Sequence, residues 1–281
     1  MAEYDFRRVS PTAFKVVASL AMYTDVSSAK SMVEELRKDS AVRTLMDGLA
    51  SVRPAPESAV YFEARYKAIN WLLDQYLDKH SSLKVLELAA GFSPRGLELS
   101  SNPAVSYVET DLPEQIRLKE TAVTSLLGKL PSALKYCAAD ATKPDEVVLA
   151  ASTFSSGPVV IVTEGLLRYL TLDEKNQLLE GVRAVLETYG GCWITPDIHL
   201  EKWTCAHASF SRTVDLVGRD LLTNYFSSFA DARSFFANAG FSIEEHPLLE
   251  HLEGKISSLH YASSEQRAQL AERAVWVMRL K

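Results

Sequence analysis

Acidic residues and one glycine follow apolar segments in the middle of the chain, at positions typical of a ligand site. The segment LELAAGFSPRG, residues 86–96, carries Glu87 inside an apolar run and Gly91 just after it. The next apolar segment contains Glu109 and ends in Asp111, and a third ends in Asp140. A carboxylate can accept hydrogen bonds from hydroxyl or amino groups, and each such charge-assisted bond contributes roughly 1.5–3 kcal/mol. The spacing therefore predicts a site that binds a small molecule.

The loop at residues 86–96 does not fit a phosphate-binding loop. A dinucleotide fingerprint requires the pattern G-x-G-x-x-G at the start of a helix, and its glycine positions here hold Ala89, Gly91 and Pro94. A pyrophosphate needs glycine there, because the backbone must approach it closely. A Walker sequence is absent. A nicotinamide oxidoreductase is therefore disfavoured.

A cofactor without phosphates makes smaller demands on this loop. S-adenosylmethionine carries an adenosine and an amino acid, and its usual loop reads acid-x-Gly-x-Gly-x-Gly. Residues 87–93 fit that frame with the middle glycine, Gly91, retained. Asp111 or Glu109 would then accept the two ribose hydroxyls, and Asp140 would meet the adenine amino group. The combination predicts S-adenosylmethionine as the cofactor.

These residues can meet only if each follows a strand of one sheet. Apolar and β-branched segments predict strands separated by amphipathic helices, at residues 83–90, 104–111, 134–140, 157–165, 190–198, 241–248 and 274–280. Strand and helix alternate, which predicts an α/β fold with a doubly wound, seven-stranded and mostly parallel sheet. Such sheets bind ligands at the carboxyl ends of their strands.

Two further parts of the chain flank this sheet. Residues 1–80 are predicted to be an N-terminal helical extension or cap, and residues 57–80 form its longest amphipathic helix. Residues 81–281 are predicted to be the cofactor-binding domain. Residues 198–228 have no clear place in the sheet and are expected to form a lid over the strand ends.

Five segments of the chain resemble one known family. VLELAAGFSPRGLEL, YVETDLPEQIRLK and VTEGLLRYLTLDE are similar to motifs of the leucine carboxyl methyltransferase family, as are FRRVSPTAF and FEARYKAINWLL nearer the start. The resemblance spans roughly residues 4–197. It favours the bacterial O-methyltransferases assigned to polyketide biosynthesis. It implies a Rossmann-like class I methyltransferase that moves a methyl group from S-adenosylmethionine to oxygen.

The resemblance also implies which residues bind the cofactor. An arginine would hold its carboxylate, a glycine would form the loop, acids would meet the ribose and adenine, and a glutamate would face its methionine end. The matching positions are Arg65, Gly91, Asp111, Asp140, Ala141 and Glu164. Glu87 would be the acid that opens the loop. The chain departs from the family at Ala89, where the family often has glycine.

Three of these residues also have a simpler interpretation. Arg65 could be a solvated charge on its helix. Asp111 could cap the helix that begins at Pro113. Glu87 could bind nearby backbone amides instead of the cofactor. Glu164 follows an apolar strand, where a carboxylate is costly without a partner, and this favours a ligand role.

Two residues are candidates for the acceptor side of the site. His199 follows the fifth predicted strand and would be a general base if the acceptor were a hydroxyl. A carboxylate acceptor needs no base, because it is already ionised at neutral pH. Arg168 could contact an acidic substrate, and both residues could instead be polar groups without a catalytic role.

Composition narrows the classes of function. The net charge is −6 and the basic residues are dispersed, which disfavours a nucleic-acid partner. No segment is typical of a signal peptide or approaches the roughly 20 apolar residues of a membrane span. We therefore expect a cytoplasmic protein with reduced cysteines and no membrane partner. The Cys and His residues lack the spacing of a metal site, so no metal is expected.

Three functions remain open at this stage. The leading one is a methyltransferase for a carboxylate or hydroxyl oxygen of a small-molecule acceptor. The alternatives are a protein C-terminal carboxyl methyltransferase and a non-catalytic metabolite-binding protein on a methyltransferase scaffold. The sequence is also compatible with a homodimer.

Overall fold

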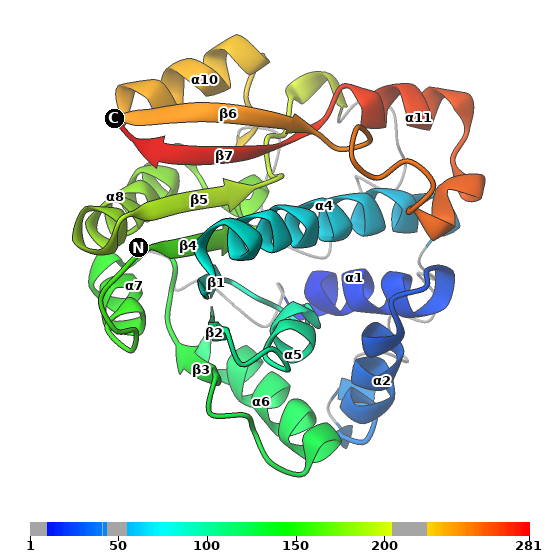
Figure 1. Ribbon diagram of the computed structural model, residues 1–281. Helices are drawn as coiled ribbons and strands as arrows, with labels where there is room; N and C mark the ends of the chain where they lie inside the picture. The colour runs from blue at the N-terminus through cyan, green and yellow to red at the C-terminus, as the bar shows by residue number, and fades with distance from the viewer. Residues whose placement is uncertain (1–9, 41, 44–54, 204–223) are drawn as a thin grey trace.

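The computed structural model describes residues 10–40, 42–43, 55–203 and 224–281 (Figure 1). Part of the helical extension predicted at residues 1–80 lies outside these ranges, as does most of the lid expected at 198–228.

A seven-stranded sheet forms the centre of the described part of the chain, in the order β3-β2-β1-β4-β5-β7-β6. The strands are β1 (Leu83–Leu88), β2 (Val105–Asp111), β3 (Leu134–Ala138), β4 (Val159–Thr163), β5 (Gly191–Thr195), β6 (Phe241–Pro247) and β7 (Ala274–Leu280). Strands β1 to β5 run parallel to one another, and β7 is antiparallel to both β5 and β6. The predicted doubly wound, mostly parallel sheet is confirmed.

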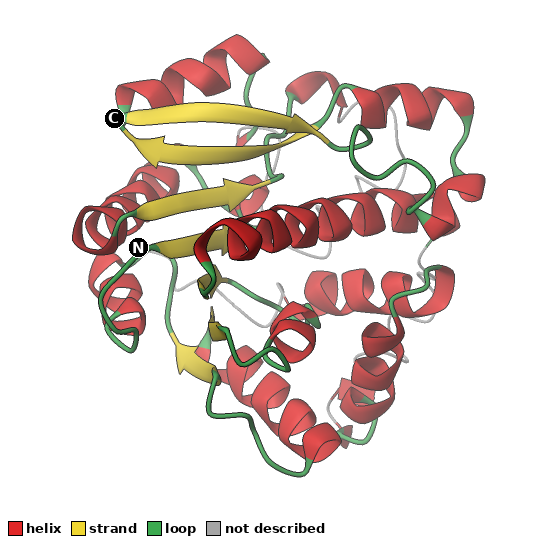
Figure 2. Ribbon diagram, viewed as in Figure 1, coloured by secondary structure: helices red, strands yellow, loops and turns green. Residues whose placement is uncertain are grey.

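Helices connect and cover the strands (Figure 2). They are α1 (Ser10–Tyr23), α2 (Ser27–Leu36), α4 (Pro56–His80), α5 (Arg95–Leu99), α6 (Pro113–Leu127), α7 (Pro144–Ala151), α8 (Leu172–Tyr189), α10 (Phe229–Asn238) and α11 (Ser264–Ala271). Thr171 and Glu174 form a capping box at the start of α8. The short helices α7 and α11 were not predicted, because eight residues carry too few turns for a clear helical period.

Side chains alternate between the two faces of the sheet, and each face has its own apolar core. Val85 and Val160 pack with α1, α2 and α4 on one face. Leu86 and Ile161 pack with α7 and α8 on the other. The N-terminal helices therefore share one core with the sheet.

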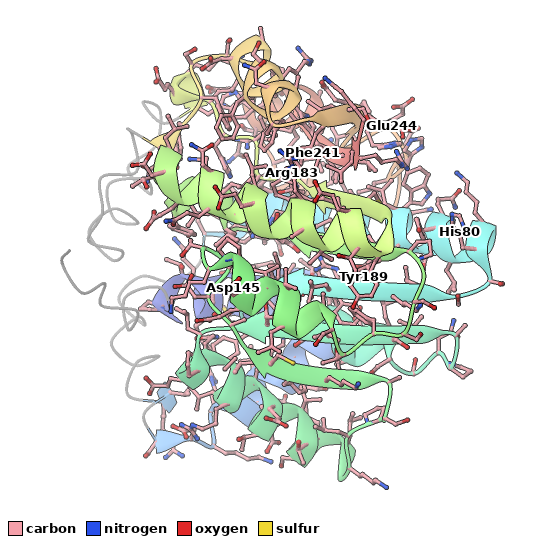
Figure 3. The ribbon with its side chains drawn as sticks, turned by 90° about the vertical axis from the view of Figure 1, so that its left-hand side faces the viewer. His80, Asp145, Arg183, Tyr189, Phe241 and Glu244 are labelled. Carbon is pink, nitrogen blue, oxygen red and sulfur yellow. The ribbon has the colours of Figure 1, made fainter. Side chains whose placement is uncertain are left out.

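Helices α7 and α8 lie side by side on the second face (Figure 3). They pack closely because Gly181 has no side chain: an added Cβ would lie 3.2 Å from Pro144 Cα. Asp145 marks the beginning of α7 and Tyr189 the end of α8 in this view. Both helices begin at the edge where the parallel strands end, as βα units require.

The carboxyl ends of the parallel strands meet at one edge of the molecule. The strand order reverses between β1 and β4, so the loops that follow these two strands leave the sheet in opposite directions. Helix α1 lies at the edge toward which the arrowheads of β4 and β5 point (Figure 1). This edge carries the candidate site.

Candidate active site

A cavity of about 1010 Å³ opens at the carboxyl ends of the strands. Its walls come from the loops after β1, β2, β3 and β4 and from helices α1 and α4. Every cofactor residue inferred from the sequence lines it: Arg65, Glu87, Gly91, Asp111, Asp140, Ala141 and Glu164.

The loop after β1 contains two left-handed positions, on either side of Ala90. Ala89 has φ of +53° and Gly91 has φ of +51°. The left-handed conformation is costly for a residue with a Cβ, so Ala89 holds strain where a glycine would have none. At Gly91 an added Cβ would lie 3.2 Å from Ala13 Cβ. Glycine at this position therefore allows α1 to pack against the loop.

Asp111 orients the same loop. Its Oδ2 accepts a hydrogen bond from the Gly91 amide at 2.7 Å, and its Oδ1 accepts one from the Leu112 amide at 2.8 Å. The cap of α6 is Leu112, which has no side-chain capping bond, so Asp111 does not fill that role. Burial raises the pKa of Asp111, and the two amides oppose that shift. Each carboxylate oxygen keeps a second lone pair for a ligand hydroxyl.

The turn after β3 is held by its own side chains. Oδ1 of Asp140 accepts hydrogen bonds from the Thr142 amide at 2.9 Å and from Thr142 Oγ1 at 2.7 Å. The Asp140 amide donates to Glu146 Oε2 at 2.7 Å. These bonds fix Asp140 and the buried Ala141 at the cavity wall.

Arg65 is a buried residue of α4, not a solvated surface charge. Its exposed fraction is 3%, and its Nε donates to Glu164 Oε1 at 2.7 Å. Arg95 donates from Nη2 to Glu164 Oε2 at 2.5 Å. Burial alone would raise the pKa of Glu164, but the two guanidinium groups hold it below its ordinary value. Glu164 is therefore a carboxylate between two cations.

Within the described part of the chain, Glu87 accepts hydrogen bonds from side chains and not from backbone amides. Its Oε1 accepts from Arg95 Nη1, and its Oε2 accepts from the Tyr107 hydroxyl at 2.7 Å. Arg95, whose importance the sequence did not reveal, is fully buried and also donates from Nε to Asn70 Oδ1 at 2.7 Å. One signal in the sequence pointed to Arg95. A cation at the first residue of a helix interacts unfavourably with the helix dipole, which indicates that a specific partner stabilises it there.

The other acid of the YVETD segment, Glu109, forms an ion pair in the protein interior. Glu109 is buried and pairs with Lys119 Nζ at 2.6 Å, and it does not line the cavity among the described residues. Burial raises the pKa of Glu109 to about 7, although Lys119 opposes that shift. Of the two acids, Asp111 is thus the one available to a ligand.

Asp197 fixes the loop that carries Glu164. Its oxygens accept hydrogen bonds from the amides of Gly165 at 2.8 Å and Leu166 at 2.7 Å. Asp197 was not among the predicted site residues. Its position directly after the fifth strand was the signal that pointed to this edge of the sheet.

Arg168 lines the cavity beyond Glu164. Its Nη2 donates to the Tyr225 hydroxyl at 2.9 Å, and its buried Nε has no hydrogen-bond partner among the described residues. In that part of the chain no carboxylate lies within ion-pair distance of Arg168. The residue can therefore bind an acidic group that enters the cavity.

His199 lies behind Arg168 and not at the cavity wall among the described residues. Its ring is stacked on Tyr225 with 5.5 Å between centroids, and it meets the edge of Tyr61 at 6.4 Å. Burial lowers the pKa of His199 well below its ordinary value, and the charges of Arg168 and Arg273 lower it further. The imidazole is neutral at physiological pH.

The described residues were predicted to hold neither a metal nor a membrane span, and the structure describes the following. They contain no group of three or more His, Cys, Asp and Glu side chains arranged to hold a metal ion. Within the same ranges, no helix combines the length and apolarity needed to cross a membrane. Cys137 and Cys192 are both free thiols.

The strand order and the cavity at the strand ends define the class I methyltransferase fold. A family model described as leucine carboxyl methyltransferase matches residues 11–183, and the chain belongs to this family. The resemblance noted from the sequence is thereby confirmed. No curated protein matches the chain.

Solved structures show the same fold. A DUF574 family protein from Streptomyces avermitilis is 15% identical, with a TM-score of 0.59 and 97% of each chain covered. A presumed O-methyltransferase from Nostoc punctiforme is 16% identical, covering 95% of this chain and 72% of that one, with a TM-score of 0.48.

A third structure is the O-methyltransferase of neocarzinostatin biosynthesis, bound to S-adenosylmethionine and 2-hydroxy-5-methyl naphthoic acid. It is 15% identical with a TM-score of 0.48, and the match covers 88% of this chain and 60% of that one.

Proposed function

We propose that the protein is an S-adenosylmethionine-dependent O-methyltransferase for a carboxylate or hydroxyl oxygen of a small-molecule acceptor. The observation that carries this proposal is the pairing of Asp111 with Gly91 at the end of β2. The carboxylate lines the cavity, is oriented by two amides, and keeps lone pairs for the two ribose hydroxyls.

The remaining residues fit the other parts of S-adenosylmethionine. Asp140 and Ala141 would contact the adenine, as the family resemblance implies. Glu164 would face the ammonium group of the methionine end, and Arg65 its carboxylate. A guanidinium suits that task because its planar fork matches a carboxylate. The bound cofactor would supply a methyl group on a sulfonium, whose sulfur leaves as a neutral thioether.

The charge of the cavity supports this cofactor over a dinucleotide. Six carboxylates line the described part of its wall, against three cations, Lys15, Arg65 and Arg168. The carboxylates are Glu87, Asp111, Glu114, Asp140, Glu164 and Glu174. A cationic sulfonium is attracted by this excess of negative charge, and a pyrophosphate is repelled.

The acceptor would enter beyond Glu164, where Arg168 and Tyr169 line the cavity. We propose that Arg168 contacts an acidic group of the acceptor. If the methylated oxygen belongs to a carboxylate, no base is required. If it belongs to a hydroxyl, a base is required; His199 is the candidate, and it would have to act through an intervening water because it does not line the described wall of the cavity. The position of His199 away from the described cavity wall favours the carboxylate.

Titration calorimetry tests the cofactor. We expect S-adenosylmethionine and S-adenosylhomocysteine to bind the wild-type protein and NAD not to bind. Asp111→Ala should lose at least about tenfold in affinity, since loss of one charge-assisted bond is worth about 1.5 kcal/mol or more. Turnover to S-adenosylhomocysteine with candidate acceptors then separates an enzyme from a non-catalytic binder. Absence of binding to either sulfur compound would refute the proposal.

A further inference from the structure

A closed network of buried charges lies under the methionine end of the proposed cofactor site. Arg95 is at its centre and contacts Glu87, Glu164 and Asn70 through its three guanidinium nitrogens. The guanidinium also lies 4.8 Å from the ring centroid of Tyr66. Glu164 in turn accepts from Arg65 with its second oxygen. Two arginines and two glutamates therefore balance one another.

A gain in folding stability alone does not account for a buried network of this kind. Removing charges from water is costly, and a buried ion network is often no more stable than apolar side chains of the same volume. The network also lies at the cavity, because Glu87, Glu164 and Arg65 all line it, whereas Arg95 does not. The network therefore fixes the positions of charged groups at the cavity wall.

The contact between Arg65 and Glu164 uses only one edge of the guanidinium. Glu164 Oε1 accepts from Arg65 Nε, while Glu164 Oε2 is occupied by Arg95 Nη2. An arginine and a carboxylate that are free to adjust favour two parallel hydrogen bonds. Arg95 opposes this arrangement, because its bond orients the second oxygen toward Arg95 and a terminal nitrogen of Arg65 would have to share that oxygen. Among the described residues, no hydrogen bond to a terminal nitrogen of Arg65 competes with a ligand in the cavity, and Nη2 lies beside Gly165, 3.5 Å from the position of an added Cβ.

We propose that Arg95 is a positioning residue for the amino-acid end of the cofactor. It holds Glu164 so that Arg65 is not drawn into a bidentate pair and can bind the cofactor carboxylate. This inference rests on the proposed function. Arg95 itself touches no cofactor atom in this role, because it lies behind Glu87 and Glu164.

The experiment compares two ligands that differ only at the end in question. S-adenosylhomocysteine carries the amino acid, and 5′-methylthioadenosine retains the adenosine and thioether but lacks the amino acid. Calorimetry with Arg95→Lys is the central measurement, because lysine keeps the charge but cannot bridge Glu87 and Glu164. We expect S-adenosylhomocysteine to bind at least about tenfold more weakly, with 5′-methylthioadenosine changed by less than about twofold.

Control variants separate positioning from loss of structure. Lys119→Gln disrupts the other buried pair, with Glu109, and should lower the melting temperature without changing the ratio of the two affinities. Asp111→Asn should weaken both ligands, because both carry the ribose. If Arg95→Lys does not fold, Asn70→Ala removes one hydrogen bond of Arg95 and should shift the ratio in the same direction.

Two results would overturn the inference. One is unchanged binding of S-adenosylhomocysteine to the folded Arg95 or Asn70 variant. The other is an equal loss of both ligands, which would mean a merely structural role. If the wild-type protein binds neither ligand, the proposed function itself fails, and the inference fails with it. This outcome is distinguishable from the two results above, because in those the wild-type protein binds both ligands.

Discussion

The amide of Gly91 donates a hydrogen bond to Oδ2 of Asp111 over 2.7 Å and so ties the loop after β1 to the end of β2. The Leu112 amide holds the other carboxylate oxygen. The carboxylate is therefore oriented before a ligand arrives, which reduces the free energy lost on binding. Loop conformation and ligand affinity should consequently change together.

Gly91→Ala tests this coupling. The left-handed φ costs roughly 1–2 kcal/mol for a residue with a Cβ, and the contact with Ala13 adds to that cost. We expect a lower free energy of unfolding by urea denaturation and weaker binding of S-adenosylhomocysteine. Gly254→Ala is the matched control, since its φ is also positive but no atom lies within 4 Å of an added Cβ. A smaller effect at Gly91 than at Gly254 would contradict the packing argument.

Ala89→Gly should relieve backbone strain. Ala89 has φ of +53°, and glycine adopts this conformation without steric cost. The gain of roughly 1–2 kcal/mol is partly offset by roughly 0.5–1 kcal/mol of extra entropy in the unfolded chain. We expect the free energy of unfolding to stay level or rise, whereas Ala90→Gly, at a position without positive φ, should lower it. Equal destabilisation of both variants would show that Ala89 is not strained.

Glu63 should make the free energy of unfolding depend on pH in the acidic range. It accepts hydrogen bonds from Lys67 and from Ser257 and Ser258 of the short helix Ser257–Tyr261. Burial alone would raise its pKa, but these donors lower it from 4.5 to about 2. A carboxyl with a lowered folded pKa stabilises the protein fully above about 4.5, its unfolded value, and loses this contribution as the pH falls toward 2.

Urea denaturation of Glu63→Gln measures that contribution. At about pH 7 the variant should be less stable by on the order of 2–3 kcal/mol, and the difference should shrink toward about pH 3. Glu253→Gln changes an exposed carboxylate in the adjoining segment and serves as the control. A Glu63 variant whose deficit is the same at both pH values would show that the charge is not responsible.

His199→Ala distinguishes the two kinds of acceptor oxygen. With a carboxylate acceptor we expect kcat to be unchanged, because no proton is removed. With a hydroxyl acceptor we expect kcat to fall by about 100-fold or more, the usual contribution of a general base. Steady-state rates with matched carboxylate and phenol compounds decide between these. Full activity of the variant on a hydroxyl acceptor would exclude His199 as the base.

Local patterns in the sequence were sufficient to predict the sheet. Short apolar segments rich in β-branched residues lie between amphipathic segments, and all the strands fall where these patterns predict. The candidate cofactor residues could also be predicted, because a residue at the end of a parallel strand must lie at one edge of the sheet. Asp111, Asp140 and Glu164 reach the cavity for this reason.

The tertiary structure alone decided which charges pair. Arg65 and Glu164 are 99 residues apart and Arg95 and Glu164 are 69 apart, and no local pattern relates them. The same holds for the position of His199 behind Arg168, which depends on packing against Tyr61 and Tyr225. The sequence determined strands and their ends, because those follow from short-range hydrophobic periodicity. Buried ion pairs depend on distances between distant elements, and only the folded chain establishes those distances.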